Sequence, residues 1–442
     1  MFDVNVAVIL IVSLLILVSL GVHIAIALGV TSALGIYLVT GNFIVVQKML
    51  ANTAYEALRA YEFAVIPLFM LMGEFISKSG AVTDVYKGIN RALRRVPGRL
   101  AVATVLGNAV FSFVTGVSIA SAAAFSRIAY PEMKRHGYHR GFALGTVAGS
   151  SCLGMLIPPS VLMIVWGLLT EKSIGQIFAA GVLPGMLLAT LFVVYVLVMA
   201  VMKPDVVGGH RDALADDLVE VDRLSVWTSA VGIALVVVSV LGGIWFGFFT
   251  PTEGAGAGAF IGLVMAFIKG MRWRGMVEAI ISVGRISAPI LLLLITAALY
   301  SRTLAMTGVT NAIQDLFLGS GMAPWMVIVV MVSVWFALGM VIDSISIMLL
   351  TVTIFEPIAV SIGYDPIAFA IVGIIAIEAG LLTPPFGLLV YTVKAAIQGI
   401  DDSVSIMQIF KSSMPYWIIM LICMVAIVVF PEIATYLPNL LF

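Results

Sequence analysis

The sequence predicts an all-α polytopic membrane protein, organised as an inverted-topology repeat with two re-entrant helical hairpins and two discontinuous helices. Three observations support this fold class. Of the 442 residues, 62% are hydrophobic and only 10% are charged, a composition that excludes a soluble globule. Apolar stretches of about 20 residues, long enough to cross a bilayer, recur along the whole chain. One polar segment divides the chain into two halves that share motifs at a fixed offset.

Charge and cysteine content limit the partners and the chemistry. The formal net charge is zero, and the sequence has no basic patch, so the expected surroundings are a lipid bilayer and not nucleic acid. The two cysteines, Cys152 and Cys423, lie in apolar segments without ligand spacing, which indicates neither a disulfide framework nor a thiolate metal site. The first apolar segment, Val4 to Gly21, lacks the basic start of a signal peptide, and we expect it to be retained.

The polar segment Lys203 to Ser225 separates the halves. We expect a first repeat at 1–202, a cytoplasmic linker at 203–225 and a second repeat at 226–442. A shift of 226 positions brings a common pattern into register, in which a proline is followed by Gly-Tyr and then by Gly-x-x-x-Pro-Pro. The matching pairs are Pro131 with Pro357, Gly137-Tyr138 with Gly363-Tyr364, Gly154 with Gly380, and Pro158-Pro159 with Pro384-Pro385.

The distribution of basic residues predicts opposite orientations for the two halves. A cluster from Arg91 to Arg99, together with Lys134 and Arg140, marks a cytoplasmic face, because loops rich in Lys and Arg stay inside. No Lys or Arg lies between Arg302 and Lys394, so the corresponding loops of the second half face outward. Both termini are then expected in the periplasm, and the halves form an inverted repeat.

The two hairpins follow from this orientation. The apolar stretch Leu100 to Tyr130 has 31 residues and basic residues at both ends, whereas two full crossings need about 40 residues. We therefore expect a hairpin at about 100–131 that enters from the cytoplasm, with Gly, Ser and Thr residues at its tip. The second hairpin, at about 324–362, enters from outside.

The proline pairs predict two broken helices, at about 139–170 and about 366–399. Each pair removes two backbone donors and forces the helix to unwind, which frees carbonyl oxygens. Such oxygens and nearby hydroxyls suit a monovalent cation, so we expect a sodium site where each hairpin tip meets a break. The first site comprises Thr115, Gly116, Ser118, Ser121, Ser150, Ser151, Gly154 and Pro158, and the second Gly339, Asp343, Ser344, Gly380, Thr383 and Pro384.

Alternative roles exist for these residues. A single Pro-Pro kink is more often a packing feature, but its repetition at one offset beside two tips favours a site. Asp343 either binds a cation or polar substrate, or hydrogen-bonds the tip backbone. Glu378 is expected to cap or brace the second break. The candidates for substrate binding are Ser121, Ser160, Asp343 and Arg302, although the expected topology also lets Arg302 snorkel to the outer interface.

Known catalytic motifs are missing from the sequence. It contains no H-E-x-x-H, no Walker-A loop and no G-x-S-x-G elbow, so we expect no catalytic residue, no cofactor and no ATP hydrolysis. Transport then depends on an ion gradient or on another subunit. A membrane-embedded enzyme is the weaker alternative because nucleophile, base and metal ligands are not grouped, and a channel is disfavoured by two closed tips.

Four segments carry a resemblance to a known family: "TGVSIASAAAFSRIAYPEMKRHGYHRGFA", "LGMLIPPS", "FFTPTEGAG" and "EAGLLTPPFG". In this order they resemble the large permease subunit of the tripartite ATP-independent periplasmic (TRAP) transporters, within the ion-transporter superfamily, and the similarity covers essentially the whole chain. The resemblance implies an elevator-type transport domain on a scaffold in the bacterial inner membrane.

The same resemblance implies a function and partners. It implies sodium-coupled import of a small organic anion, a periplasmic substrate-binding protein that delivers this anion, and a small four-helix membrane subunit that braces the scaffold. A stand-alone dicarboxylate carrier or exchanger of the same superfamily is the alternative, and it would work without the binding protein.

Overall fold

The computed structural model describes residues 4–208, 222–309, 313, 315, 317, 319 and 321–442. The middle of the expected linker at 203–225 therefore lies outside the described residues. The described chain is helical, with one isolated β-bridge between Tyr138 and Val207. Seven of the described helices are long and apolar enough to cross a membrane, or eight if a pair bent by 59° at Ala60 counts as one span. The all-helical class and the membrane-spanning helices are thus confirmed.

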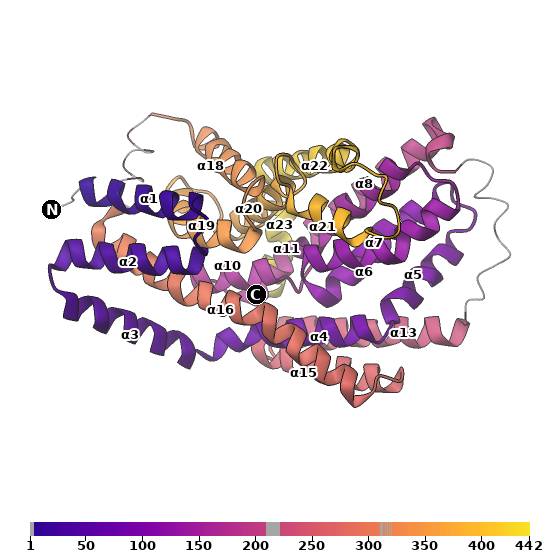
Figure 1. The fold of residues 1–442 in the computed structure, drawn as a ribbon, viewed down its shortest axis with the longest axis horizontal. Helices are drawn as coiled ribbons and strands as arrows, with labels where there is room; N and C mark the ends of the chain where they lie inside the picture. Colours follow the sequence, from indigo (N-terminus) through magenta and orange to yellow (C-terminus); the bar gives the residue numbers. More distant parts are fainter. Residues whose placement is uncertain are drawn as a thin grey trace.

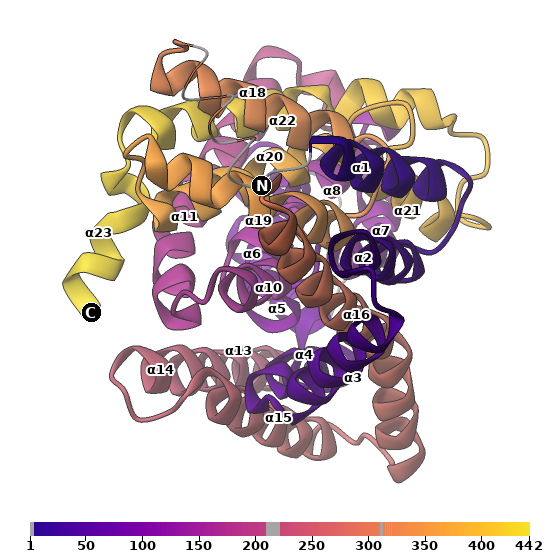
Figure 2. The same cartoon turned by 90° about the vertical axis from the view of Figure 1, so that its left-hand side faces the viewer.

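One group of helices, called the outer layer, lies beside the hairpins and broken helices (Figures 1 and 2). Within it α4 packs on α15, and α2 packs on α16, which is 35 residues long. α15 presents Gly258 and Gly262 to α4, where an added Cβ would meet Met72, and such small residues let membrane helices approach closely. The group comprises α1 (Val4–Ser19), α2 (Ile24–Thr40), α3 (Phe43–Arg59), α4 (Val65–Lys78), α13 (Arg223–Val237), α14 (Gly243–Trp245), α15 (Pro251–Ile268) and α16 (Trp273–Thr307).

The first hairpin consists of α6 (Arg99–Thr115) and α7 (Ser118–Arg135), with α5 (Ala81–Ala92) packed against α6. The chain reverses at Gly116, whose φ of 61° is left-handed and costs glycine little. The second hairpin consists of α18 (Pro324–Gly339) and α19 (Ser344–Ser361). Asp343 begins α19 as its N-cap.

Both Pro-Pro segments interrupt helices. The first broken helix runs through α8 (Arg140–Ser151) and the single turn α9 (Leu153–Leu156), and it resumes as α10 (Val161–Thr170). The second runs through α20 (Pro366–Gly380) and resumes as α21 (Leu388–Ala396). The peptide bonds Pro158-Pro159 and Pro384-Pro385 are both cis.

The helix after each break packs against the hairpin of the other half. α10 contacts α19, and α21 contacts α7. A buried aromatic cluster joins α10 to α18 and α20, with the ring centroids of Trp166 on α10 and Trp335 on α18 5.8 Å apart and Phe369 on α20 touching both. The two halves are therefore interlocked around the breaks.

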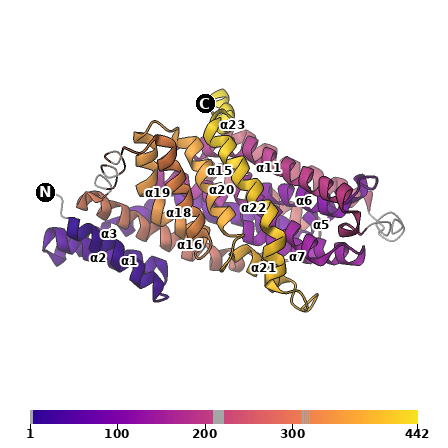
Figure 3. The same ribbon diagram turned by 90° about the horizontal axis from the view of Figure 1, so that it is seen from above.

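Three further helices complete the packing around this centre. α22 (Ile406–Val429) crosses the molecule and contacts both α8 and α20, as seen from above in Figure 3. α11 (Ile174–Met202) contacts α6, α20 and α22, and it packs along α23 (Glu432–Leu441). As a result, the helices before both breaks, α8 and α20, are almost entirely buried.

Candidate functional site

The tip of the first hairpin lies directly on the first break. The carbonyl of Gly116 accepts a hydrogen bond from the amide of Val161, at 3.1 Å, and a Cβ added to Gly116 would collide with the carbonyl oxygen of Pro159. On the other side, a Cβ on Gly154 would lie 2.9 Å from the amide nitrogen of Ser118. Backbone therefore faces backbone on both sides, and only glycine fits at these two positions.

Two of the hydroxyls expected in the first site, those of Ser121 and Ser150, belong to a buried hydrogen-bond network. Asn108 connects them, because its amide donates to Ser150 Oγ and its carbonyl oxygen accepts from Ser121 Oγ, both at 2.6 Å. Asn108 was not predicted from the sequence. It could have been, because it is a lone amide in an apolar hairpin helix and a polar residue inside a membrane is a functional candidate.

Three other hydroxyls at the first tip and break donate to nearby backbone, whereas Ser118 Oγ is buried without a hydrogen-bond partner. Ser151 donates to Ala148 O and Ser160 to Met155 O, each at 2.6 Å, and Thr115 donates to Phe111 O at 3.0 Å. A hydroxyl that donates its proton keeps two lone pairs. All these side chains are buried, so their free lone pairs face the protein interior.

The second tip meets the second break in a similar manner. The carbonyl of Met340 accepts from the amides of Phe386 and Gly387, at 3.1 and 3.3 Å. Gly339 and Gly380 lie against each other, since a Cβ on Gly380 would be 2.7 Å from Gly339 Cα. Gly387 and Val161, which hold the two tip carbonyls, are 226 positions apart. Each tip carbonyl is thus held by a backbone amide at the end of a break.

Two polar side chains of the second site interact with their own helices. Asp343 accepts from Ser346 N at 3.0 Å and also from the Ser346 hydroxyl, so it caps α19. Thr383 Oγ1 donates to Gly380 O at 2.6 Å. In the structure Asp343 is therefore a helix cap, and cation binding by its carboxylate stays a prediction.

Glu378 lies between the two tips, in the last turn of α20. Its Oε1 accepts a hydrogen bond from Ser344 Oγ at 2.8 Å, and the hydroxyl of Ser118 lies near the same carboxylate but makes no hydrogen bond to it. The thiol of Cys152, at the first break, contacts the carbonyl oxygen of Glu378 at 3.8 Å. Glu378 thus joins both hairpin tips and both breaks, a position that the sequence did not reveal.

Arg302, a candidate for substrate binding, contacts residues outside the tips and breaks. Its guanidinium pairs with Glu56 at 2.6 Å and donates to Thr53 at 3.2 Å, both on α3. These contacts join two helices of the outer layer. Arg302 therefore stabilises α16 against α3, and among the described residues its hydrogen bonds and ion pair reach neither a tip nor a break.

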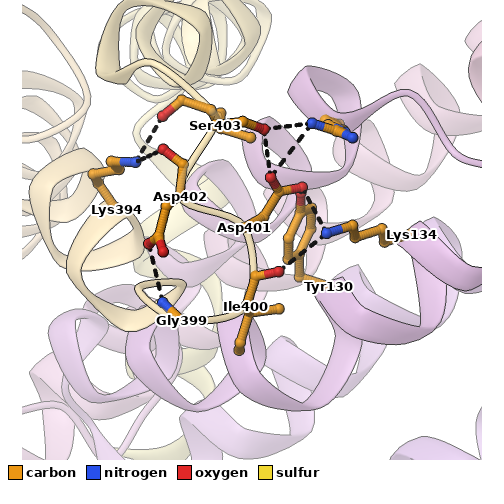
Figure 4. A network of polar contacts seen from close by, with 10 residues as sticks. Tyr130, Lys134, Lys394, Gly399, Ile400, Asp401, Asp402 and Ser403 are labelled. Atoms are coloured by element: carbon orange, nitrogen blue, oxygen red, sulfur yellow. Dashed lines mark hydrogen bonds and ion pairs between the residues drawn. The ribbon is translucent and has the colours of Figure 1, made fainter.

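A second polar network surrounds Asp401, in the loop after α21 (Figure 4). The Asp401 carboxylate pairs with Lys134 at 2.9 Å and Arg140 at 3.4 Å, and it accepts from Tyr130 at 2.8 Å and Ser403 at 2.7 Å. The Ser403 hydroxyl, followed by Lys134 and Tyr130, holds the pKa of Asp401 well below its usual range. The network ties the first hairpin and the first broken helix to the end of the second broken helix.

Bilayer-length helices, breaks inside buried helices and hairpin tips set against those breaks define the class of secondary membrane transporters. The comparison with known families agrees with this class. A model described as "Tripartite ATP-independent periplasmic transporter, DctM component" matches residues 11–433. The chain belongs to this family and is a membrane transporter subunit, not an enzyme.

Relatives and solved structures support the assignment. The chain is 32% identical over 394 residues to the C4-dicarboxylate TRAP transporter large permease protein DctM of Pseudomonas aeruginosa, covering 89% of this chain and 90% of the relative. It is 28% identical over 400 residues to the ectoine/5-hydroxyectoine TRAP transporter large permease protein UehC of Ruegeria pomeroyi, covering 90% and 89%.

Among solved structures, the fold is similar to that of the Alcanivorax borkumensis YdaH transporter, with a TM-score of 0.62 and 13% identity, covering 90% of this chain and 89% of the other. At this identity the likeness concerns the fold alone.

Proposed function

We propose that this chain is the large permease subunit of a sodium-coupled importer for a small organic anion in the bacterial inner membrane. One observation carries the proposal, namely that two hairpin tips each lie on a Pro-Pro break, at positions 226 residues apart. The names of the relatives, which include a C4-dicarboxylate and an ectoine transporter, support a small, charged organic substrate.

The two halves act as an inverted repeat with one sodium ion at each tip. Oxygen atoms supply the ligands: carbonyls near Gly154 and Pro158 with the hydroxyls of the first site, and carbonyls near Gly380 and Pro384 with those of the second. A hydroxyl that donates its proton to the backbone still has lone pairs that can coordinate a cation. Because the tips, the breaks and the Asp401 network are tied together, they move as one domain against the outer layer, which corresponds to an elevator.

The substrate binds between the two sodium sites, near Ser121, Ser160 and Asp343. Arg302 has no part in this proposal, because it is paired with Glu56. The bound sodium ions supply the positive charge that a carboxylate needs, so the protein itself requires no buried arginine at this place. Substrate affinity then depends on sodium.

The partners follow from the tripartite family. A periplasmic binding protein delivers the substrate, and a small four-helix membrane subunit covers apolar surface of the outer layer, where Phe43, Trp273 and Phe260 are exposed. Both termini of the chain face the periplasm.

Reconstitution tests this function. The chain, its small subunit and its binding protein are placed in liposomes, and uptake of a radiolabelled C4-dicarboxylate and of ectoine is measured with an inward sodium gradient or with choline in its place. The proposal predicts accumulation of one compound that requires both sodium and the binding protein. Accumulation without a sodium gradient would contradict the coupling, and undiminished uptake without the binding protein would favour a stand-alone carrier.

A further inference from the structure

The guanidinium of Arg127 lies on the first hairpin without a counter-charge. Arg127 is exposed on α7, and among the described residues it takes part in no ion pair and no hydrogen bond. The helices that pack most closely against α7, namely α6, α8, α9 and α21, contain no Asp or Glu. Glu132 on α7 itself lies 3.9 Å from His136, and Asp401, beside the basic end of α7, already has two basic partners.

Arg127 is also far from both ends of its helix. It lies nine residues after Ser118 and eight before Arg135, which corresponds to about 13 and 12 Å along the helix axis. Long basic side chains snorkel to the membrane interface from positions near a helix end, whereas Arg127 is more than two turns from either end. A charge in this position, without a protein partner, needs water or a bound anion.

The face of α7 that carries Arg127 is lined by small side chains. Ala120, Ala123 and Arg127 follow one another at the spacing of a single helical face, and Ala120 is exposed while Ala123 is half-buried. Side chains on a helix point back toward its N-terminus, so the Arg127 side chain extends over these alanines in the direction of the first tip. The alanines are too small to cover the guanidinium, which therefore stays accessible.

The second break, next to this hairpin, has an exposed backbone segment. Residues 384–386 are exposed, Phe386 to 54%, and Val341 of the second tip is 55% exposed. Non-helical backbone at membrane depth occurs only inside protein or along a water-filled cavity, so an exposed break requires water. α21 leads away from this break and packs along α7 as far as the Asp401 network. Arg127 therefore lies on the helix beside the one that starts at the exposed break.

We propose that Arg127 is an anion-binding residue on a water-filled path between the tips and the cytoplasm, where it receives the carboxylate of the transported anion. The identity of the anion rests on the proposed function, whereas the unpaired charge does not. A guanidinium binds a carboxylate through two parallel hydrogen bonds. An unpaired positive charge also raises the local concentration of anions, so Arg127 draws the substrate from the sodium sites toward the cytoplasm.

Cysteine labelling tests the charge and its access to water without any transport. Ala123→Cys places a thiol one turn from Arg127. Purified protein in lipid nanodiscs is treated at low ionic strength with an anionic sulfonate and a cationic ammonium methanethiosulfonate, and the two rates are compared. A unit charge about 6 Å away in water changes each rate about three-fold, in opposite directions. We therefore expect the ratio of the anionic to the cationic rate to be about 10-fold higher than in Ala123→Cys/Arg127→Gln.

The chain offers matched controls for this labelling. The parent chain should not react, because Cys152 and Cys423 are both buried. Val194→Cys should react slowly, since Val194 is 49% exposed on the apolar helix α11, eight residues before its end, and a thiol that faces lipid does not form the reactive thiolate. Ala123→Cys/Arg127→Lys should keep most of the preference for the anionic reagent, because the positive charge remains.

Two results would overturn the proposal. If Ala123→Cys reacts no faster than Val194→Cys, the face of α7 that carries Arg127 is in contact with lipid and not with water. If the ratio of the two rates is the same with and without Arg127→Gln, the guanidinium attracts no anion.

Uptake into proteoliposomes tests the role of Arg127 in transport. Arg127→Gln should lower the maximal rate several-fold, and Arg127→Lys should restore most of it, while the melting temperature stays unchanged because Arg127 has no partner to lose. An unchanged maximal rate in Arg127→Gln would contradict a role in transport. Absence of uptake in the wild type would contradict the proposed function, and the labelling experiment would still decide on the anion-binding charge.

Discussion

Replacement of Gly380 by alanine tests the contact between the second tip and the second break. A Cβ at this position would lie 2.6 Å from the carbonyl oxygen of Phe336 and 2.7 Å from Gly339 Cα, whereas ordinary contact begins at 3.4 Å. The hairpin must therefore move away by about 0.8 Å. Both obstacles are backbone atoms, so no side chain can rotate out of the way.

The cost of this movement sets the expected effect. Overpacking of a close contact costs roughly 1–3 kcal/mol, which lowers the population of the docked tip by about 5- to 150-fold. The assay is the rise in melting temperature of the purified chain on replacing choline chloride with sodium chloride. We expect Gly380→Ala to lose most of this sodium-dependent rise.

A matched control is Gly284→Ala in α16, where an added Cβ meets nothing within 4 Å. Alanine in an open helix position is neutral or stabilising, so the sodium response of Gly284→Ala should equal that of the wild type. A full sodium response in Gly380→Ala would refute the reasoning, because the docked tip would then tolerate a methyl group.

Three further predictions concern polar residues. Asp401→Asn should lower the melting temperature at neutral pH, and the control Asp402→Asn should not. Because the pKa of Asp401 is lowered by folding, its stabilisation is present above the unfolded value of about 3.9 and is lost as pH falls below it, so the two proteins should converge in acid. Asn108→Ala removes the acceptor of the buried Ser121 hydroxyl, while Ser150 keeps its bond to Thr146 O; this should cost about 1–3 kcal/mol and be visible in denaturant titration. Asp343→Asn keeps the helix cap, since Asn and Asp cap equally well, yet it should weaken sodium binding several-fold in calorimetry; an unchanged affinity would leave Asp343 a cap alone.

The fold class could be predicted from the sequence because its signals are local and repeated. Hydropathy predicts apolar helices along the whole chain, and the proline pairs place the interruptions of α8–α10 and α20–α21, since a proline pair cannot continue a helix. The glycines beside the breaks also have a direct structural reason, because a Cβ on Gly154 or Gly380 would strike backbone of a hairpin.

The contacts between the halves could not be predicted in the same way. The packing of α10 on α19 and of α21 on α7 joins segments far apart in the chain, and no periodicity reports such a partner. The position of Glu378 depends on this arrangement, because Ser344 of the second hairpin and Cys152 of the first broken helix both touch it. The ion-pair partner of Arg302 could not be predicted either, because only the fold places Glu56 beside its guanidinium.

Sodium stoichiometry tests the central claim, that each tip and its break form one cation site. Isothermal titration with sodium chloride is carried out on the wild-type chain, Gly154→Val and Gly380→Val, with Gly284→Ala as the control. The proposed function predicts two sodium ions for the wild type and the control, and one for each valine variant. Equal stoichiometry in all four proteins would contradict the claim.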